Sequence, residues 1–546
     1  MKLVHGFHGD NIRGDIYGGL TAAVVALPLA LAFGVASGAG PIAGLYGAIA
    51  VGFFASVFGG TPAQISGPTG PMTVVMAAIV TQYAGNPAMA FTVVMLGGLL
   101  QILFGVLKLG RYINLMPFPV ISGFMSGIGF IIIILQFAPF LGQTNPPGGP
   151  LAALLNFPVL LAHPVGDAVA LGAISLAIVF LTPASINRII PAPLIALATG
   201  TLLALFLFTG APILADVPTG LPSLQIPTLT VEDFPDIVGS ALVLAVLGSL
   251  DSLLTSLIAD NATRTNHESD RELIGQGIGN TIAGLIGGLP GAGATMRTIV
   301  NVRAGGRTPI SGALHAAILL AVVLGLAPLA EHIPHAVLAG ILFRVGIDII
   351  DWDYLRRIRR APRVGVLFML IVLGLTVFVD LIVAVAVGVV MASLLFVKRM
   401  ADLQNESIRT ITGETEDAPL SDEARAILKS AEGRLLLFHL GGPMSFGVAK
   451  GMGRCFSVSN KFEALVFDLT DVPLIDSSAS LALRDGIKHA RADGRPVFLA
   501  GARPAVEEVL DRLGVFDYLP AGHRFSTRAE ALRAALDHIG PGEGPG

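Results

Sequence analysis

Charged residues are scarce in this sequence of 546 residues, because Asp, Glu, Lys and Arg make up 13% of it, about half of their share in an average soluble domain. The single cysteine, Cys455, excludes an intramolecular disulfide and gives no zinc-binding pattern with histidine. The net charge of −4 gives no indication of nucleic-acid binding. No nucleophile–base constellation and no phosphate-binding fingerprint is visible, so the sequence predicts neither an enzyme nor a cofactor.

Long apolar runs dominate instead, from about residue 14 to residue 400, and the mean hydropathy is +0.75. Most of these runs approach the length that crosses a bilayer. We predict spans at about 15–37, 42–58, 89–107, 119–140, 166–183, 190–210, 236–259, 272–288, 310–330, 334–350, 364–380 and 381–398. Two shorter apolar segments, at about 67–83 and 294–303, bring the expected number of crossings to about fourteen.

The connecting loops differ in charge. Loops near 37–42, 83–88, 141–165, 211–235, 288–293 and 331–335 contain no Lys or Arg. The intervening loops carry the basic residues, among them Lys108, Arg111, Arg188, Arg264, Arg271, Arg303, Arg307 and the arginines of 356–363. This is the positive-inside pattern, and it predicts that both termini lie in the cytoplasm. The alternation would break if either short segment failed to cross.

The two short segments are preceded by Gly- and Pro-rich sequence, at 66–73 and 290–297. Such interrupted segments in corresponding positions of two halves point to a binding site built from half-helices near the middle of the membrane. Each half-helix presents unpaired N–H groups and partial positive charge at its N-terminus, which predicts an anion site. The groups expected to line it are the hydroxyl of Thr69 and the closely approaching backbone of Gly293, Ala294 and Thr295.

A short pattern recurs in the two halves. Pro, Val and Gly have the same spacing in 116–123 and 333–340, and Gly129 matches Gly346. Each copy opens the fifth crossing of its half. Because seven crossings per half is an odd number, the halves must have opposite orientation, as in the inverted repeats of many secondary transporters.

Two ionisable residues, Asp251 and Arg297, fall at membrane depth, where charges are costly and usually functional. Asp251 and Thr255 are four residues apart and therefore share one side of a helix. A carboxylate, a hydroxyl and half-helix carbonyls together suit Na⁺. Arg297 could bind the anion through two hydrogen bonds, or it could pair with Asp251, neutralise it and abolish Na⁺ binding. Phe33 either walls the anion site or only packs.

The sequence after residue 401 has the composition of an ordinary soluble domain. Strand-like runs at 435–440, 464–469 and 496–500 alternate with helical patterns at about 447–457, 478–492, 504–514 and 527–538, which predicts an α/β domain. Asp476 or Ser477 suits the N-cap of the second helix. We expect a transmembrane domain at 1–400, a charged linker at 401–432 and the α/β domain at 433–540.

The Asp476-Ser477-Ser478 turn and its surroundings resemble a STAS domain, in which a serine of this turn can be phosphorylated, so these three residues are expected to form a regulatory turn. Membrane spans followed by a STAS domain are the layout of the sulfate permease (SulP) family of anion transporters. Further stretches that resemble the family are Pro28 and residues 44–46, 67–69 and 272–277. The resemblance implies a polytopic helical protein of 7+7 inverted repeats, with a core of spans 1–4 and 8–11, a gate of spans 5–7 and 12–14, and a homodimeric state.

Within the family the chain most resembles the sodium-dependent bicarbonate transporters of cyanobacteria, through residues 11–16, 69–76, 121–129 and 346–352. This resemblance implies that Asp251 and Thr255 hold Na⁺ together with the backbone of 293–295, and that the anion lies next to Thr69. Arg297 departs from that pattern, in which the position is Gly. Arg is common there in other family members, which commonly carry Glu in place of Asp251.

We therefore expect a secondary active transporter of a small anion, with bicarbonate moved by Na⁺ symport as the main hypothesis. Sulfate or a C4-dicarboxylate, moved by H⁺ symport or exchange, is the alternative, followed by an anion channel or sensor. A nucleobase permease of the same fold is disfavoured by the STAS domain. We expect the bacterial cytoplasmic membrane as location, Na⁺ as the only metal ion, and a cytoplasmic protein partner through the STAS domain.

Overall fold

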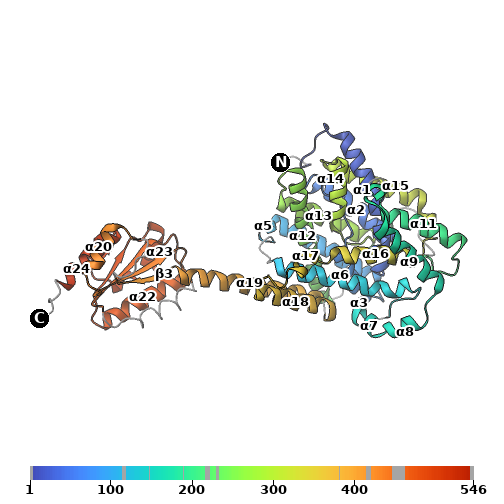
Figure 1. The fold of residues 1–546 in the computed structure, drawn as a ribbon. Helices are drawn as coiled ribbons and strands as arrows, with labels where there is room; N and C mark the ends of the chain where they lie inside the picture. The colour runs from blue at the N-terminus through green and yellow to red at the C-terminus, as the bar shows by residue number, and fades with distance from the viewer. Residues whose placement is uncertain are drawn as a thin grey trace. The chain divides into compact units, whose positions relative to one another are not determined.

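The computed structural model of the protein describes residues 4–113, 118–146, 148–187, 190–214, 222–228, 233–379, 381–412, 420–445 and 462–540. The chain divides into two compact units, Met1–Ala392 and Ser393–Gly546. The first unit is a bundle of helices and the second is a sheet flanked by helices (Figure 1).

Every predicted span is a helix. The first half comprises α1 (Ile12–Ala36), α2 (Pro41–Phe58), α3 (Gly70–Gln82), α4 (Pro87–Val106), α6 (Phe118–Phe140), α9 (Gly166–Leu181) and α11 (Ala192–Phe206). The second half comprises α12 (Phe234–Thr263), α13 (Ser269–Leu285), α14 (Thr295–Ala304), α15 (Pro309–Ala330), α16 (His335–Ile349), α18 (Arg363–Phe378) and α19 (Leu381–Glu406). Short helices lie between them: α5 (Gly110–Ile113), α7 (Gly149–Leu155), α8 (Phe157–Ala162), α10 (Ala184–Asn187) and α17 (Trp352–Arg356).

The helices differ in how completely they could cross a membrane. Within the described part of the chain, α1, α2, α4, α6 and α12 are long and apolar enough to cross alone. Helices α3, α9, α11 and α18 are apolar but shorter. The half-helix α14 is followed by α15 at a bend of 112°, so the chain turns sharply where the second broken segment ends.

The inverted repeat is visible in helix packing. Gly129 of α6 and Gly346 of α16, which the repeat pairs in sequence, lie against each other: a Cβ on either would come within 2.6 Å or 2.9 Å of the other's carbonyl oxygen. A Cβ on Gly123 of α6 would likewise meet a backbone carbonyl oxygen of α18, and a Cβ on Gly340 of α16 would meet one of α9. Because α9 and α18 are each the sixth spanning helix of their half, the same packing is repeated with the halves exchanged.

The two broken segments meet in a short two-stranded sheet. Strand β1 (Ser66–Gly67) pairs antiparallel with β2 (Ala292–Gly293), with Ser66 opposite Gly293 and Gly67 opposite Ala292. Gly291 tolerates no side chain, because a Cβ there would lie 2.5 Å from the carbonyl carbon of Gly67. Helices α3 and α14 begin just after these strands, so the sheet brings their N-termini together.

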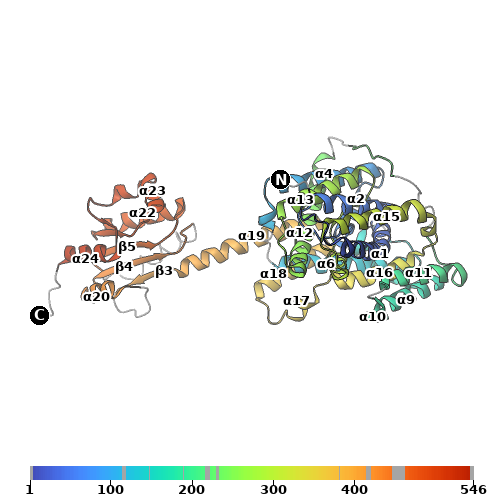
Figure 2. The same ribbon diagram turned by 90° about the horizontal axis from the view of Figure 1, so that it is seen from above.

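Helices of the two halves interlock around this sheet. Helix α13 packs on both α2 and α4, and α15 packs on both α1 and α2 (Figure 2). The main hydrophobic cluster of the unit draws buried residues from both halves, including Leu31, Met76, Ile128, Leu244 and Val337. The broken segments are therefore held in the interior of the bundle.

The second unit contains a five-stranded sheet in the order β3-β4-β5-β6-β7. Strand β3 (Ile408–Ile411) is antiparallel to β4 (Leu435–Gly441), whereas β5 (Ala464–Asp471), β6 (Val497–Ala500) and β7 (Arg524–Phe525) continue it in parallel. Alternate residues of β4 point to opposite faces: Leu436 joins a cluster with α22 (Ser477–Ala492) and α23 (Pro504–Arg512), and Leu437 joins one with α20 (Asp422–Ser430) and α24 (Arg528–Ile539).

The predicted strands and three of the predicted helices of this unit are present, and the helix expected at 447–457 lies outside the described residues. The stretch 401–432, expected to be a linker, contains the end of α19, strand β3 and helix α20. Strand β3 pairs with β4 over its full length and α20 packs on α24, so these two elements of the stretch pack within the second unit.

Candidate substrate and ion site

Thr69 immediately precedes the first half-helix. Its backbone is extended, at φ −121° and ψ 164°, and its side chain makes no capping hydrogen bond to α3. The hydroxyl instead donates to Oδ2 of Asp251 over 2.8 Å. The N-terminus of α14 likewise has no side-chain cap among the described residues. The first N–H groups of both half-helices are therefore not taken by side chains, as an anion site requires.

Asp251 lies in the middle of α12 and is 9% exposed. It borders a small cavity of about 20 Å³ whose other walls come from α6, α18 and α19, among them Phe124 and Val372. A volume of this size holds about one water molecule. Apolar atoms line this cavity, so Asp251 is separated from α6, α18 and α19 by a narrow apolar gap.

Oxygen atoms gather one turn further along α12. The Thr255 hydroxyl donates to the carbonyl oxygen of Gly293 over 2.9 Å and lies 2.8 Å from the Thr295 hydroxyl. Because a hydroxyl has one proton to give, Thr295 is the donor in the second pair. Gly293 is fixed further by its N–H, which donates to Oγ of Ser252 over 3.1 Å. With Asp251 this is a set of carboxylate, hydroxyl and carbonyl oxygens, which suits a hard cation.

Arg297 lies in the first turn of α14 and is 2% exposed. Its Nη2 donates to the carbonyl oxygen of Pro68 over 2.6 Å, and its Nη1 lies beside Gly67. Nη1 is buried and has no hydrogen-bond partner among the described residues. No ion pair between Arg297 and Asp251 occurs in the described part of the chain. The guanidinium thus reaches across to the loop before the first half-helix.

The remaining predicted site residues lie as follows. Ala294 precedes α14, and its N–H donates to the carbonyl oxygen of Ile65 over 2.8 Å. Gly293 and Thr295 belong to the oxygen set just described. Phe33 is buried in the main hydrophobic cluster of the unit, on α1, which agrees with a packing role.

Sequence reasoning passed over a buried carboxylate, Glu272 of α13, which is 1% exposed. Its Oε2 accepts hydrogen bonds from the backbone N–H groups of Gly60 (2.9 Å) and Thr61 (3.0 Å). Its Oε1 accepts from Nε2 of Gln64 and of Gln276, both at 2.7 Å. Glu272 therefore fixes the loop that leads into the first half-helix. A carboxylate in an apolar span is costly, so the sequence did carry a signal for Glu272. It was missed because Glu272 is the first residue of the predicted span at 272–288.

A second buried carboxylate, Asp15 of α1, holds the loop that follows the second half-helix. It accepts hydrogen bonds from the N–H groups of Arg307 (2.8 Å) and Thr308 (2.9 Å) and from the Thr308 hydroxyl (2.8 Å). Asn280 adds a third anchor, because it exchanges hydrogen bonds with the backbone of Gly291. The chain around both half-helices is thus fixed by buried polar side chains.

In the second unit, Asp476 is the N-cap of α22 and accepts a hydrogen bond from the N–H of Ala479 over 2.8 Å. Ser477 and Ser478 follow it at the start of the helix and are exposed. The turn is therefore capped as expected, and both serine hydroxyls can be reached from solvent.

The two halves are inverted repeats, and their half-helices meet in the interior. This is the architecture of secondary transporters that bind their substrate between the two repeats. Residues 12–372 match the model of the sulfate permease family, and residues 426–531 match that of the STAS domain. The chain belongs to the sulfate permease family. It is a membrane anion transporter with a C-terminal STAS domain, and the family is one of transporters rather than enzymes.

Individual relatives agree with this assignment. The chain is 48% identical to the bicarbonate transporter BicA of Picosynechococcus sp. over 99% of this chain and 98% of the relative. It is 51% identical to the solved transmembrane domain of a cyanobacterial bicarbonate transporter BicA, covering 70% of this chain and all of the other, with a TM-score of 0.66. The structure of SLC26A9, at 18% identity, covers 97% of this chain and 91% of its own with a TM-score of 0.83, which shows that the fold is shared.

Proposed function

We propose that this protein transports bicarbonate by Na⁺ symport. The observation that carries the proposal is the hydrogen bond between Thr69 and Asp251, which joins the first half-helix to the oxygen set suited to Na⁺. The likeness to bicarbonate transporters over nearly the whole chain supports the choice of anion.

In this proposal the anion binds between the N-termini of α3 and α14. The backbone N–H groups there, the Thr69 hydroxyl and Nη1 of Arg297 are the donors, and Gly293, Ala294 and Thr295 shape the second half of the site. Na⁺ is held by Asp251, Thr255 and the carbonyl oxygen of Gly293, with the Thr295 hydroxyl nearby. The two sites share the 293–295 segment, so one conformational change can carry both ions.

Coupling between the ions follows from charge. Without Na⁺, the Asp251 carboxylate repels an anion at the neighbouring half-helices, and unit charges about 4 Å apart interact by about 4 kcal/mol at an effective dielectric constant of about 20. Na⁺ offsets this repulsion. It also competes for the carboxylate oxygen that now accepts the Thr69 proton, which lets the hydroxyl turn toward the anion.

A second candidate, transport of sulfate or a C4-dicarboxylate by H⁺ symport or exchange, is favoured by one observation. The unpaired Nη1 of Arg297 adds a fixed positive charge, which suits a divalent anion. In that case Asp251 would carry a proton rather than Na⁺.

We further propose that the protein lies in the bacterial cytoplasmic membrane with both termini and the STAS domain in the cytoplasm, on the basis of the loop charges. A homodimer is expected from the family, and the domain limits 1–400 and 433–540 stay a prediction. The exposed Ser477 and Ser478, beside Asp476, are proposed as the regulatory turn that a cytoplasmic protein partner would read.

Uptake by proteoliposomes tests the proposal. Labelled bicarbonate, sulfate and fumarate are offered in turn, with an inward Na⁺ gradient, with an inward H⁺ gradient and with neither. We expect accumulation of bicarbonate that requires Na⁺. Accumulation of sulfate or fumarate driven by H⁺ would support the second candidate, and passive flux without accumulation under any gradient would indicate a channel.

A further inference from the structure

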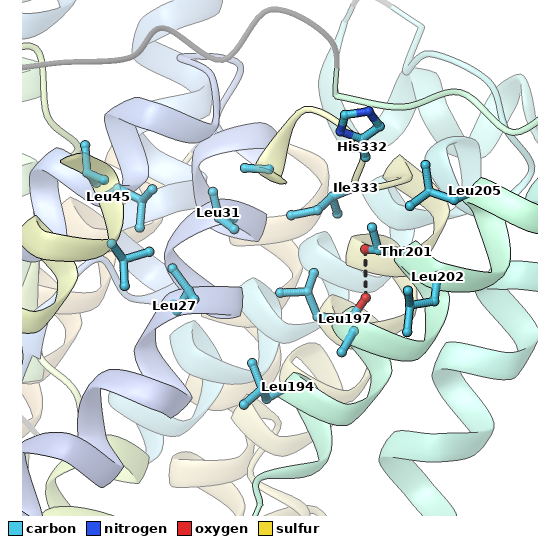
Figure 3. A pocket seen from close by; sticks show the side chains of 14 residues that line it. Leu27, Leu31, Leu45, Leu194, Leu197, Thr201, Leu202, Leu205, His332 and Ile333 are labelled. Carbon is cyan, nitrogen blue, oxygen red and sulfur yellow. Dashed lines mark hydrogen bonds between the residues drawn. The ribbon is translucent and has the colours of Figure 1, made fainter. Parts of the chain in front are cut away.

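A second cavity in the first unit is lined by helices other than the half-helices α3 and α14. Its volume is about 500 Å³, within the range of about 300–1,000 Å³ typical of ligand pockets. One wall is formed by Leu27 and Leu31 of α1, and the opposite wall by Leu194, Leu197 and other residues of α11 (Figure 3). None of the residues assigned above to the anion or the cation borders it.

The walls offer almost no hydrogen bonds. Among the described residues of the lining, Thr201 of α11 carries the one hydroxyl, and it already donates to the carbonyl oxygen of Leu197 over 2.8 Å (Figure 3). His332 is the one ionisable side chain in the described part of the lining, and it lies at the rim. A polar ligand buried here would lose its hydrogen bonds to water without replacement, so the occupant must be apolar along most of its length.

The cavity has the depth of one lipid leaflet and is open toward lipid. Leu194 and Leu205 on its α11 wall are eleven residues apart, which corresponds to about 16 Å of helix, or about half of a hydrocarbon core about 30 Å thick. Leu202 and Leu205 are 57% and 46% exposed, so the bordering helix face is bare where the membrane surrounds it.

We propose that this cavity binds one acyl chain of a membrane phospholipid. Leucine walls, one-leaflet depth and an opening onto the lipid-facing surface fit a hydrocarbon chain, and the exposed His332 at the rim can contact its headgroup. The chain would lie between α11, a gate helix, and the core helices α1, α2 and α15. Displacement of the core against the gate would reshape the cavity, so the bound chain would influence the rate of transport.

Photolabelling of the whole protein tests the proposal without relying on transport. The protein is reconstituted in vesicles that contain a phospholipid with a photoreactive group at the end of one acyl chain, irradiated, and mapped by mass spectrometry. We expect label concentrated on residues 194–205, 322–323 and 330–333, several-fold above the lipid-facing surface of α9. Equal labelling of α9 and α11 would overturn the proposal.

Cavity-filling variants supply the control. Ala198 is exposed within the cavity lining, whereas Ala177 is exposed on α9 outside it. A198W should reduce the label on α11 to the level of α9, and A177W should leave it unchanged. T201F provides an independent filling variant. Unchanged labelling in A198W and T201F, or cross-linking of α11 to a second copy of the chain in place of lipid, would contradict binding of an acyl chain.

Discussion

The hydroxyl of Thr69 donates a hydrogen bond of 2.8 Å to the carboxylate of Asp251. The two residues are 182 positions apart and come from opposite halves of the inverted repeat. One belongs to the predicted anion site and the other to the predicted cation site, so a single contact links them. This contact gives a physical route by which Na⁺ at the carboxylate changes what the hydroxyl offers to the anion.

Replacing the carboxylate should remove Na⁺ coupling while keeping the fold. In D251N the amide oxygen still accepts the Thr69 hydrogen bond, but the negative charge that attracts Na⁺ is gone. We expect bicarbonate uptake to become insensitive to the Na⁺ gradient, measured as initial rate against Na⁺ concentration. D236N is the matched control, because Asp236 is exposed at the start of the same helix. Retention of the wild-type Na⁺ dependence in D251N would remove this residue from the cation site.

Arg297 should determine anion affinity through the geometry of its guanidinium. R297K keeps the charge but loses the fork that spans the Pro68 carbonyl and the anion. Loss of a charge-assisted hydrogen bond of about 1.5–3 kcal/mol predicts a KM for the transported anion that rises about tenfold or more, with a smaller effect on the maximal rate. R303K, at an exposed position of the same helix, should match the wild type. An unchanged KM in R297K would exclude direct contact.

Glu272 should be needed for stability. In E272Q an amide NH₂ replaces one acceptor oxygen, so it faces donors from Gly60 and Thr61 or from Gln64 and Gln276. A buried donor left without an acceptor costs about 1–3 kcal/mol, and we expect a clear fall in the thermal unfolding midpoint. E268Q, at a half-exposed surface ion pair, should cost less than about 1 kcal/mol. Equal midpoints for the two variants would show that the Glu272 network does not hold the loop.

The second unit should lose stability in acid through Asp468. Burial alone would raise the pKa of this carboxyl, but hydrogen bonds from His439 (2.7 Å) and Thr470 (2.6 Å) and the charge of Arg528 (2.6 Å) lower the pKa below its ordinary value. A lowered pKa in the folded state stabilises the fold above the unfolded pKa, which is about 3.9, and this contribution is lost as the pH falls through the folded pKa.

The measurement is the unfolding free energy of residues 393–546 between pH 6 and pH 2, about the range in which carboxyl groups titrate. We expect a decline below about pH 4 that is shallower in D468N, and D493N, at an exposed position, serves as control. Parallel curves for the wild type and D468N would show that this cluster does not cause the loss of stability at low pH.

Much of the membrane unit could be predicted from sequence, because hydropathy, loop charge and the Gly/Pro interruptions each report a separate physical constraint. Together they located all the spanning helices, including α3 and α14, which are too short to be recognised by length alone. The Gly129–Gly346 match likewise predicted a repeat that the structure shows as a direct contact.

Other features needed the structure. The short strands β3 and β7 lie at the edges of their sheet and carry too few residues for a periodic pattern, so the sequence did not predict them. The choice between anion binding by Arg297 and its pairing with Asp251 depended on where the side chain points. Its hydrogen bond to the carbonyl oxygen of Pro68 joins residues that are 229 positions apart in sequence. Such long-range contacts leave no local signal, and the anchoring of both half-helices by Glu272 and Asp15 was missed for the same reason.

The most direct test of the account is the dissociation constant of bicarbonate, measured on the purified protein with no Na⁺ and with saturating Na⁺. Coupling through Thr69 and Asp251 predicts at least about tenfold tighter binding with Na⁺, equivalent to about 1.4 kcal/mol, and by linkage an equal gain in Na⁺ affinity when bicarbonate is bound. The gain should vanish in D251N. Equal dissociation constants with and without Na⁺ in the wild-type protein would contradict the account.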